Sequence, residues 1–245
     1  MNFGLILAGG VGQRMRNSGK PKQFLEIYGK PILIYTLEKF EACKDIDMIV
    51  LVSNPAWIEY TQELIKRYGL KKVTAVTGGG KDRQGSVENG LRAIESAGGK
   101  NDDIVVIHDG VRPLIETSII SENIRVAQRY GSAMTVRQVV ESVVVTSSDT
   151  AGFDSFKKRN DTYTLTAPQT FTIRNMHESY QKIRERAQDS EPIPLLDTAL
   201  VWTFLGNNVH LVKENNHNIK ITTPEDYYML RAILEMKENQ SVFGI

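Results

Sequence analysis

Four short apolar runs constrain the fold of this chain more than any other feature. They are Phe3–Ala8, Ile49–Val52, Val73–Val76 and Ile104–Ile107. Apolar residues at helical spacing lie between or after these runs, around residues 32–37, 57–68, 87–94 and 119–127. A continuous apolar run indicates a strand that is buried on both faces, and strands that alternate with helices form parallel β-α-β units. The pattern therefore predicts an α/β fold.

The expected architecture is one domain over residues 1–245, with a doubly wound, mostly parallel, Rossmann-like sheet. Sheets of this kind bind ligands beyond the carboxyl ends of their strands. Three turns should share that rim: the turn at Gly9, the turn at Gly80 and the corner at His108-Asp109. We expect the functional site among them.

Residues from about 137 to 166 interrupt the alternation and are predicted to form a β-hairpin arm. Val139–Thr146 is rich in β-branched residues, and Ser147–Gly152 has the composition of a turn. An isolated hairpin is marginal in water, so a second subunit is the expected packing partner, which makes this a dimerisation arm and the protein a homodimer. An edge hairpin that folds on its own domain is the alternative.

The end of the chain predicts further helices and one short strand. Met176, Tyr180, Ile183 and Ala187 repeat at helical spacing, and residues 197–205 form a shorter helical segment. Asn218–Ile221 is predicted to be a strand, followed by a helix that begins with Thr223-Pro224-Glu225-Asp226. Lys220 would then lie on a rigid strand just before a helix; a solvated lysine on an edge strand is the alternative.

The N-terminal strand runs into a glycine-rich turn, Gly9-Gly10-Val11-Gly12-Gln13-Arg14-Met15, and Lys20-Pro21-Lys22-Gln23 follows. Such a turn lets backbone N–H groups approach phosphate oxygens, and Arg14 and Lys22 add positive charge for a polyphosphate. The ATPase loop is excluded because no Gly-Lys-Ser/Thr follows, and the dinucleotide fingerprint fails because Met15 stands at its third glycine. The pattern indicates a nucleotidyltransferase; a turn that uses glycine only for its shape is the alternative.

Composition excludes several classes of protein. A net charge of +1 argues against binding nucleic acid through a broad basic surface. The single Cys43 excludes a disulfide framework and a multi-cysteine zinc site. Because there is neither a leader pattern nor a run of membrane-spanning length, we expect a soluble, cytoplasmic protein without a membrane partner.

Six motifs, taken in order, resemble those of the CTP-dependent cytidylyltransferases that act on small polyol phosphates. This family includes the 2-C-methyl-D-erythritol 4-phosphate and the ribitol 5-phosphate enzymes. The motifs are Leu7–Met15, Pro21–Gln23, Gly79–Val87, His108–Pro113, Ala167–Phe171 and Asn218–Asp226. The resemblance covers nearly the whole chain and implies transfer of CMP from CTP to a polyol phosphate, with release of pyrophosphate.

The resemblance also implies a role for individual residues. Arg14 and Lys22 look like the pair that stabilises charge on the α-phosphate, and Arg159 and Lys220 like the residues that position the attacking phosphate. Asp109 and Arg112 would meet the polyol phosphate or the metal-bound triphosphate. In relatives, the counterpart of Arg159 lies on the arm and reaches the neighbouring subunit's site. The residues expected to bind the nucleotide are Leu7, Ala8, Gly9, Gly10, Gly80, Arg83, Ser86, Asp109, Arg112 and Ser142.

The chemistry of this transfer calls for cations rather than a covalent nucleophile. Positive groups and Mg²⁺ bring two anions together and absorb the charge of the transition state. The expected cofactor is therefore Mg²⁺, for which Asp109 is the candidate ligand, because this ion usually takes one or two carboxylates and substrate phosphates. His108 is predicted to be a structural imidazole and not a general base.

Three positions bear on the acceptor. Val111 precedes Arg112, as is common in the ribitol enzymes; Asp197 is followed by Thr198-Ala199; and Ala167 replaces a common Thr before Pro-Gln. These features favour ribitol 5-phosphate over 2-C-methyl-D-erythritol 4-phosphate. A sugar-1-phosphate nucleotidyltransferase that uses another nucleotide, and a non-catalytic nucleotide-binding protein, remain as alternatives.

Overall fold

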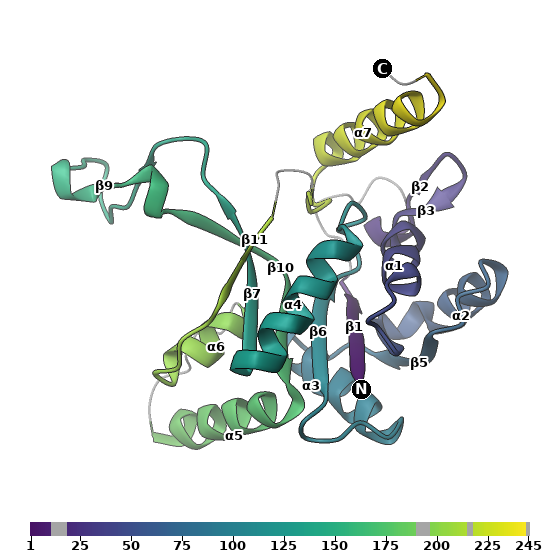
Figure 1. Ribbon diagram of the computed structural model, residues 1–245, viewed down its shortest axis with the longest axis horizontal. Helices are drawn as coiled ribbons and strands as arrows, with labels where there is room; N and C mark the ends of the chain where they lie inside the picture. Colours follow the sequence, from purple (N-terminus) through teal and green to yellow (C-terminus); the bar gives the residue numbers. More distant parts are fainter. Residues whose placement is uncertain (11–18, 190–196, 215–217, 244–245) are drawn as a thin grey trace.

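The computed structural model describes residues 1–10, 19–189, 197–214 and 218–243. Its centre is a seven-stranded sheet in the order β11-β7-β10-β6-β1-β4-β5 (Figure 1). Every neighbouring pair is parallel except those made by β10, which runs antiparallel to β6 and β7. The strands are β1 (Asn2–Ala8), β4 (Met48–Ser53), β5 (Val73–Gly78), β6 (Ile104–Asp109), β7 (Ser132–Gln138), β10 (Tyr163–Thr172) and β11 (Leu211–Lys213). The prediction of a mostly parallel sheet is confirmed.

Helices cover both faces of this sheet, as the doubly wound prediction requires (Figure 1). Strand residues alternate between the two cores: Ile49 and Leu51 pack with α1 and α4, whereas Val50 and Val52 pack with α3 and α5. This double burial explains why the central strands are continuous apolar runs. The helices are α1 (Ile32–Ala42), α2 (Ile58–Arg67), α3 (Arg83–Ser96), α4 (Thr117–Tyr130), α5 (Ile173–Asp189), α6 (Thr198–Phe204) and α7 (Pro224–Phe243).

Within the described residues, short 3-10 helices and a small two-stranded sheet complete the body and the arm. The 3-10 helices are η2 (Lys22–Phe24), η3 (Pro55–Trp57), η4 (Phe153–Ser155) and η5 (Arg159–Asp161), and the small sheet pairs β2 (Glu26–Ile27) with β3 (Lys30–Pro31). The first of them, η2, is the element that places Lys22.

The region predicted as an arm projects from the body between β7 and β10 (Figure 1). Its pairing comes in two short stretches. The ends of β7 and β10 pair at Arg137 with Thr164 and at Gln138 with Tyr163, and further out β8 (Val143–Val144) pairs with β9 (Phe156–Lys157). Apolar side chains on it are exposed, including Phe153 at 92% and Val145 at 60%. The dimerisation role stays a prediction.

The prediction of a strand at Asn218–Ile221 is wrong. Residues 218–222 belong to no sheet, and the Ile221 N–H, which donates to the Val111 carbonyl at 2.9 Å, is their backbone hydrogen bond to the 110–114 loop. Lys220 therefore lies on a connecting segment and not on a rigid strand. The helix start that follows is confirmed: Asp226 Oδ2 accepts from the backbone N–H groups of Thr222 at 2.7 Å and Thr223 at 2.8 Å, and α7 begins at Pro224.

Among the described residues, no helix is both long enough and apolar enough to cross a bilayer.

Candidate active site

A cavity of about 400 Å³ lies where the carboxyl ends of β1 and β6 meet the loop after β5. Leu7 pairs with Asp109 across β1 and β6, so the two strands deliver their ends to the same rim. The cavity brings together most of the predicted site residues, namely Leu7, Ala8, Gly9, Gly10, Lys22, Gly80, Arg83, Ser86, Asp109 and Lys220. Gln23, Lys81 and Asp82, which were not among the predicted site residues, also line it, as does Val111, which was named only as a position that bears on the acceptor.

Backbone packing explains the glycines on this rim. A Cβ atom on Gly80 would lie 2.4 Å from the carbonyl carbon of Gly85, and one on Gly9 would lie 3.4 Å from the Cα of Gly79. The first contact lies between the loop after β5 and the start of α3 and leaves no room for a side chain, and the second brings the turn after β1 against that loop at van der Waals distance. These glycines leave backbone groups, rather than side chains, to face a ligand.

The loop after β5 is closed by its own side chains. Asp82 caps α3 by accepting from the N–H of Gly85 at 2.7 Å. The Ser86 hydroxyl accepts from the N–H of Gly80 at 3.0 Å and donates to the carbonyl of Asp82 at 2.8 Å. The N-terminus of α3 therefore faces the cavity, where its positive dipole favours an anion.

Gln23 connects the element that carries Lys22 to the glycine-rich turn. Its side chain is 1% exposed, and Nε2 donates to the carbonyls of Ala8 at 2.8 Å and Gly10 at 3.0 Å. Because both amide hydrogens hold carbonyls of the turn, the position of Lys22 is linked to that of the turn. The Pro-Lys-Gln motif thus contains a cation and the group that positions it.

We expect Gln23→Met to raise the KM for CTP by about tenfold, because a side chain of similar length without donors leaves the buried Ala8 carbonyl unpaired and releases the Gly10 carbonyl of the turn. Steady-state kinetics with CTP as the varied substrate measure this change. Gln181→Met is the matched control, since Gln181 is exposed and its amide contacts only Glu185 among the described residues. Unchanged kinetics in Gln23→Met would show that the turn keeps its shape without the amide.

In the same cavity, one carboxylate oxygen of Asp109 pairs with two cations. Arg112 Nε lies 3.0 Å and Lys220 Nζ 3.1 Å from Asp109 Oδ2. Burial raises the pKa of this carboxyl, but Lys220, Arg112 and Arg83 together outweigh burial and hold the pKa well below its usual range. Asp109 is therefore ionised wherever the protein is folded near neutral pH.

His108, next to this pair, is placed as a structural group. Its ring is fully buried, packs against Phe40 with ring centroids 5.2 Å apart, and has Nε2 3.3 Å from the Arg112 carbonyl. Burial lowers the pKa of His108 to about 4, so the imidazole is neutral at pH 7.

Three of the predicted residues that the structure describes do not line this cavity, and a fourth, Arg14, lies outside the described residues. Arg112 reaches the site through Asp109 and lines an adjoining hollow. Arg159 and Ser142 are both on the arm, where Arg159 Nη2 lies 3.5 Å from Ser142 Oγ.

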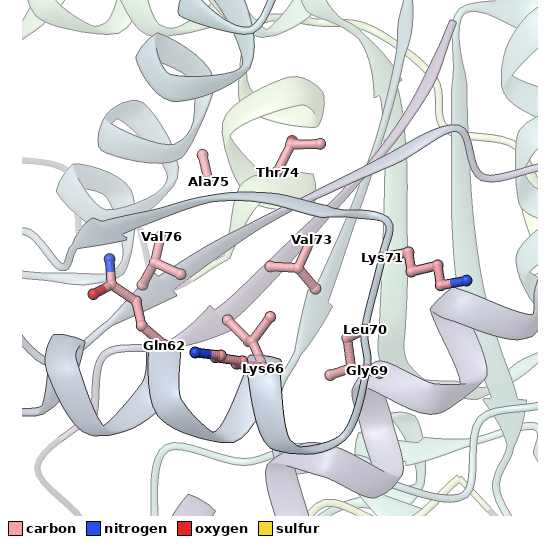
Figure 2. Close-up of a pocket in the computed structure, with 10 residues that line it drawn as sticks. Gln62, Lys66, Gly69, Leu70, Lys71, Val73, Thr74, Ala75 and Val76 are labelled. Atoms are coloured by element: carbon pink, nitrogen blue, oxygen red, sulfur yellow. The ribbon is translucent and has the colours of Figure 1, made fainter.

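A second hollow, of about 390 Å³, lies between α2 and the edge strand β5 (Figure 2). Figure 2 shows Gln62 and Lys66 beside Val73 and Val76, and no residue of the predicted site lines this hollow. We therefore place the chemistry in the cavity at the glycine turns.

This fold and site define a nucleotidyltransferase, an enzyme class that joins a nucleotidyl group to an acceptor. The family model of 2-C-methyl-D-erythritol 4-phosphate cytidylyltransferase (IspD) matches residues 3–236, and the chain belongs to this family of cytidylyltransferases. The predicted family and enzyme class are thereby confirmed.

Curated relatives match over their full length. The ribitol-5-phosphate cytidylyltransferase of Vibrio parahaemolyticus is 43% identical over 244 residues, and that of Streptococcus agalactiae is 37% identical over 245 residues; both matches cover 100% of each chain.

Solved structures share the fold. The 4-diphosphocytidyl-2C-methyl-D-erythritol synthase of Anaerococcus prevotii has a TM-score of 0.78 and 25% identity, with 95% of each chain covered. The 2-C-methyl-D-erythritol 4-phosphate cytidylyltransferase of Francisella tularensis has a TM-score of 0.73 and 24% identity, with 95% of this chain and 99% of that chain covered.

Proposed function

We propose that this enzyme transfers CMP from CTP to ribitol 5-phosphate, forming CDP-ribitol and releasing pyrophosphate. The acceptor is supported by the full-length similarity to two enzymes named for ribitol 5-phosphate, at 43% and 37% identity. The alternative acceptor, 2-C-methyl-D-erythritol 4-phosphate, is supported by the name of the family model.

One observation carries the proposal: two hollows share Lys220 in their lining. The adjoining hollow, of about 270 Å³, offers hydroxyl groups and positive charge, and its lining residues are Arg112, Arg137, Thr164, Leu165, Thr166, Ile219, Lys220 and Asp226. Cations suit the phosphate of the acceptor, and hydroxyl groups suit a polyol. A phosphate held at Lys220 would border the cavity that the nucleotide occupies.

The chemistry proceeds by attack of an acceptor phosphate oxygen on the α-phosphorus of CTP. The new P–O bond forms as the bond to the pyrophosphate oxygen breaks, and charge spreads over the equatorial oxygens. Lys22, from η2, and Arg14 stabilise that charge, while Lys220 orients the attacking phosphate. The residues supply position and charge, so no side chain becomes covalently attached.

Mg²⁺ is the proposed cofactor, and Asp109 is the carboxylate that fits it. Asp109 lines the cavity and stays ionised, and Mg²⁺ is commonly bound by one or two carboxylates together with substrate phosphates and water. The ion would neutralise phosphate charge when the nucleotide is bound.

A homodimer assembled through the arm is also part of the proposal. The exposed apolar side chains of the arm, Phe153 and Val145 among them, would be buried by a second copy, and Arg159 would reach that copy's site. Because CTP is the donor, we expect the enzyme to work in the cytoplasm.

A pyrophosphate-release assay tests the proposal. CTP with ribitol 5-phosphate should give the highest kcat/KM when compared with 2-C-methyl-D-erythritol 4-phosphate and glycerol 3-phosphate. CTP should exceed UTP by at least about 100-fold, because a site that hydrogen-bonds the cytosine amine leaves buried groups unpaired against a carbonyl. Comparable rates with UTP or GTP would instead indicate a wider sugar-nucleotide enzyme. CTP binding without pyrophosphate release from any acceptor would indicate a non-catalytic protein.

A further inference from the structure

The segment 218–222 carries Lys220 into the active site, yet no strand pairing holds it. Its backbone tie to the 110–114 loop is the single bond from Ile221 N–H to the Val111 carbonyl. A lysine that orients a phosphate for reaction must be positioned to within about 0.5 Å, so the segment that carries it needs further contacts. The structure supplies this support at the start of the segment.

That support is Asn218, whose side chain is 3% exposed. Its amide Nδ2 donates to the Ala167 carbonyl on β10 at 2.7 Å and to Glu214 Oε2 at 2.8 Å. Both partners are acceptors, so the amide nitrogen, and not the oxygen, must face them. One residue thus joins the segment to the sheet and to the end of β11.

The backbone of Asn218 makes a third contact, and it reaches the active site. Its carbonyl accepts from Arg112 Nη1 at 2.9 Å, while Arg112 Nε pairs with Asp109. Two residues further along, Lys220 pairs with the same oxygen of Asp109. Arg112 and Lys220 therefore both depend on where Asn218 is held.

We infer that Asn218 is a positioning residue, which holds Arg112 and Lys220 in place on the acceptor side of the site. This inference rests on the proposed function, because it assigns the two cations to the acceptor phosphate. Asn218 is not itself a lining residue of either hollow, so its effect is transmitted through its carbonyl to Arg112 and along the backbone to Lys220.

The chemistry of its neighbours explains why asparagine is required. Burial raises the pKa of Glu214, but its bonds with Asn218 and Thr166 oppose that shift. An ionised aspartate at position 218 would have no hydrogen to donate and would face a carboxyl and a carbonyl oxygen. Asn218→Asp therefore removes two bonds and adds repulsion with almost no change in shape.

Steady-state kinetics with CTP and ribitol 5-phosphate test the inference. In Asn218→Asp, the KM for the acceptor should rise by about tenfold or more and kcat should fall, while the KM for CTP stays within about twofold. A general structural defect would change both KM values. Asn101→Asp is the matched control, because Asn101 is exposed and lies before β6, at the amino end of the strands.

A second variant tests the contact itself. In Asn218→Asp combined with Glu214→Gln, the new amide can donate to the new carboxylate, so part of the loss in acceptor KM should be recovered. Should Asn218→Asp fail to fold, as judged by thermal unfolding, Asn218→Ala removes the same donors without adding charge and serves for the same comparison.

The outcomes separate this inference from the proposed acceptor. If wild type turns over another polyol phosphate and not ribitol 5-phosphate, the proposed acceptor is wrong, and the same KM comparison is made with the acceptor that works. If wild type is active and Asn218→Asp keeps its acceptor KM, or raises both KM values together, Asn218 has no positioning role.

Discussion

Replacing Lys22 by alanine is expected to lower kcat by about 10³-fold, the loss typical for removal of one group that stabilises transition-state charge. Lys22 lines the cavity beside the glycine turn, where the triphosphate of CTP is proposed to lie. The KM for CTP should change much less, because the turns and the N-terminus of α3 remain as a phosphate-binding surface. Pyrophosphate release under saturating CTP and acceptor measures the change.

Lys66→Ala is the control for this variant. It removes the same charge from an exposed side chain that lines the hollow between α2 and β5, away from the glycine turns (Figure 2). Wild-type turnover in Lys66→Ala together with the loss in Lys22→Ala locates the chemistry at the turns. Near-normal turnover in Lys22→Ala would remove Lys22 from the catalytic assignment.

The second large effect concerns the arm, and it uses two variants that are inactive alone. If Arg159 acts in the partner's site, each active site combines Lys22 of one chain with Arg159 of the other, and homodimers of Lys22→Ala or Arg159→Ala are both nearly inactive. In a mixed dimer both defects fall in one site and the other site is intact. Random pairing of equal amounts makes about half of the dimers mixed and restores about a quarter of wild-type activity.

Co-expression with two different tags, followed by purification through both, yields the mixed dimer without relying on exchange of chains. The purified mixed species should have about half of the wild-type activity per dimer, since one of its two sites is intact. Verified mixed dimers that stay inactive would show that Arg159 works within its own chain or that the arm does not cross.

The sequence predicted the centre of the fold better than its edge. The strands β1, β4 and β6 are buried on both faces, so their sequences are continuous apolar runs that indicate a strand without help from other signals. Strands β7, β10 and β11 were not predicted. In β10 the alternation is broken by Pro168, and its pairing with β7 shifts register between Leu165 and Gln169.

The candidate site divides in a similar way. Residues at strand ends, such as Gly9 and Asp109, could be predicted because a parallel sheet brings the carboxyl ends of its strands to one rim. The roles of Gln23 and Asn218 could not be predicted, because each side chain acts through hydrogen bonds to backbone carbonyls that are distant in the sequence. No periodicity indicates which buried amide will meet which carbonyl.

The shared oxygen of Asp109 has a consequence for the protein before any substrate arrives. Arg112 and Lys220 carry like charges, which would repel each other if no anion lay between them. The Asp109 carboxylate forms an ion pair with each of them, and its negative charge holds the two cations together in the absence of a substrate phosphate. The two cations are therefore preorganised before an anionic substrate binds. The substrate does not have to bring them together itself.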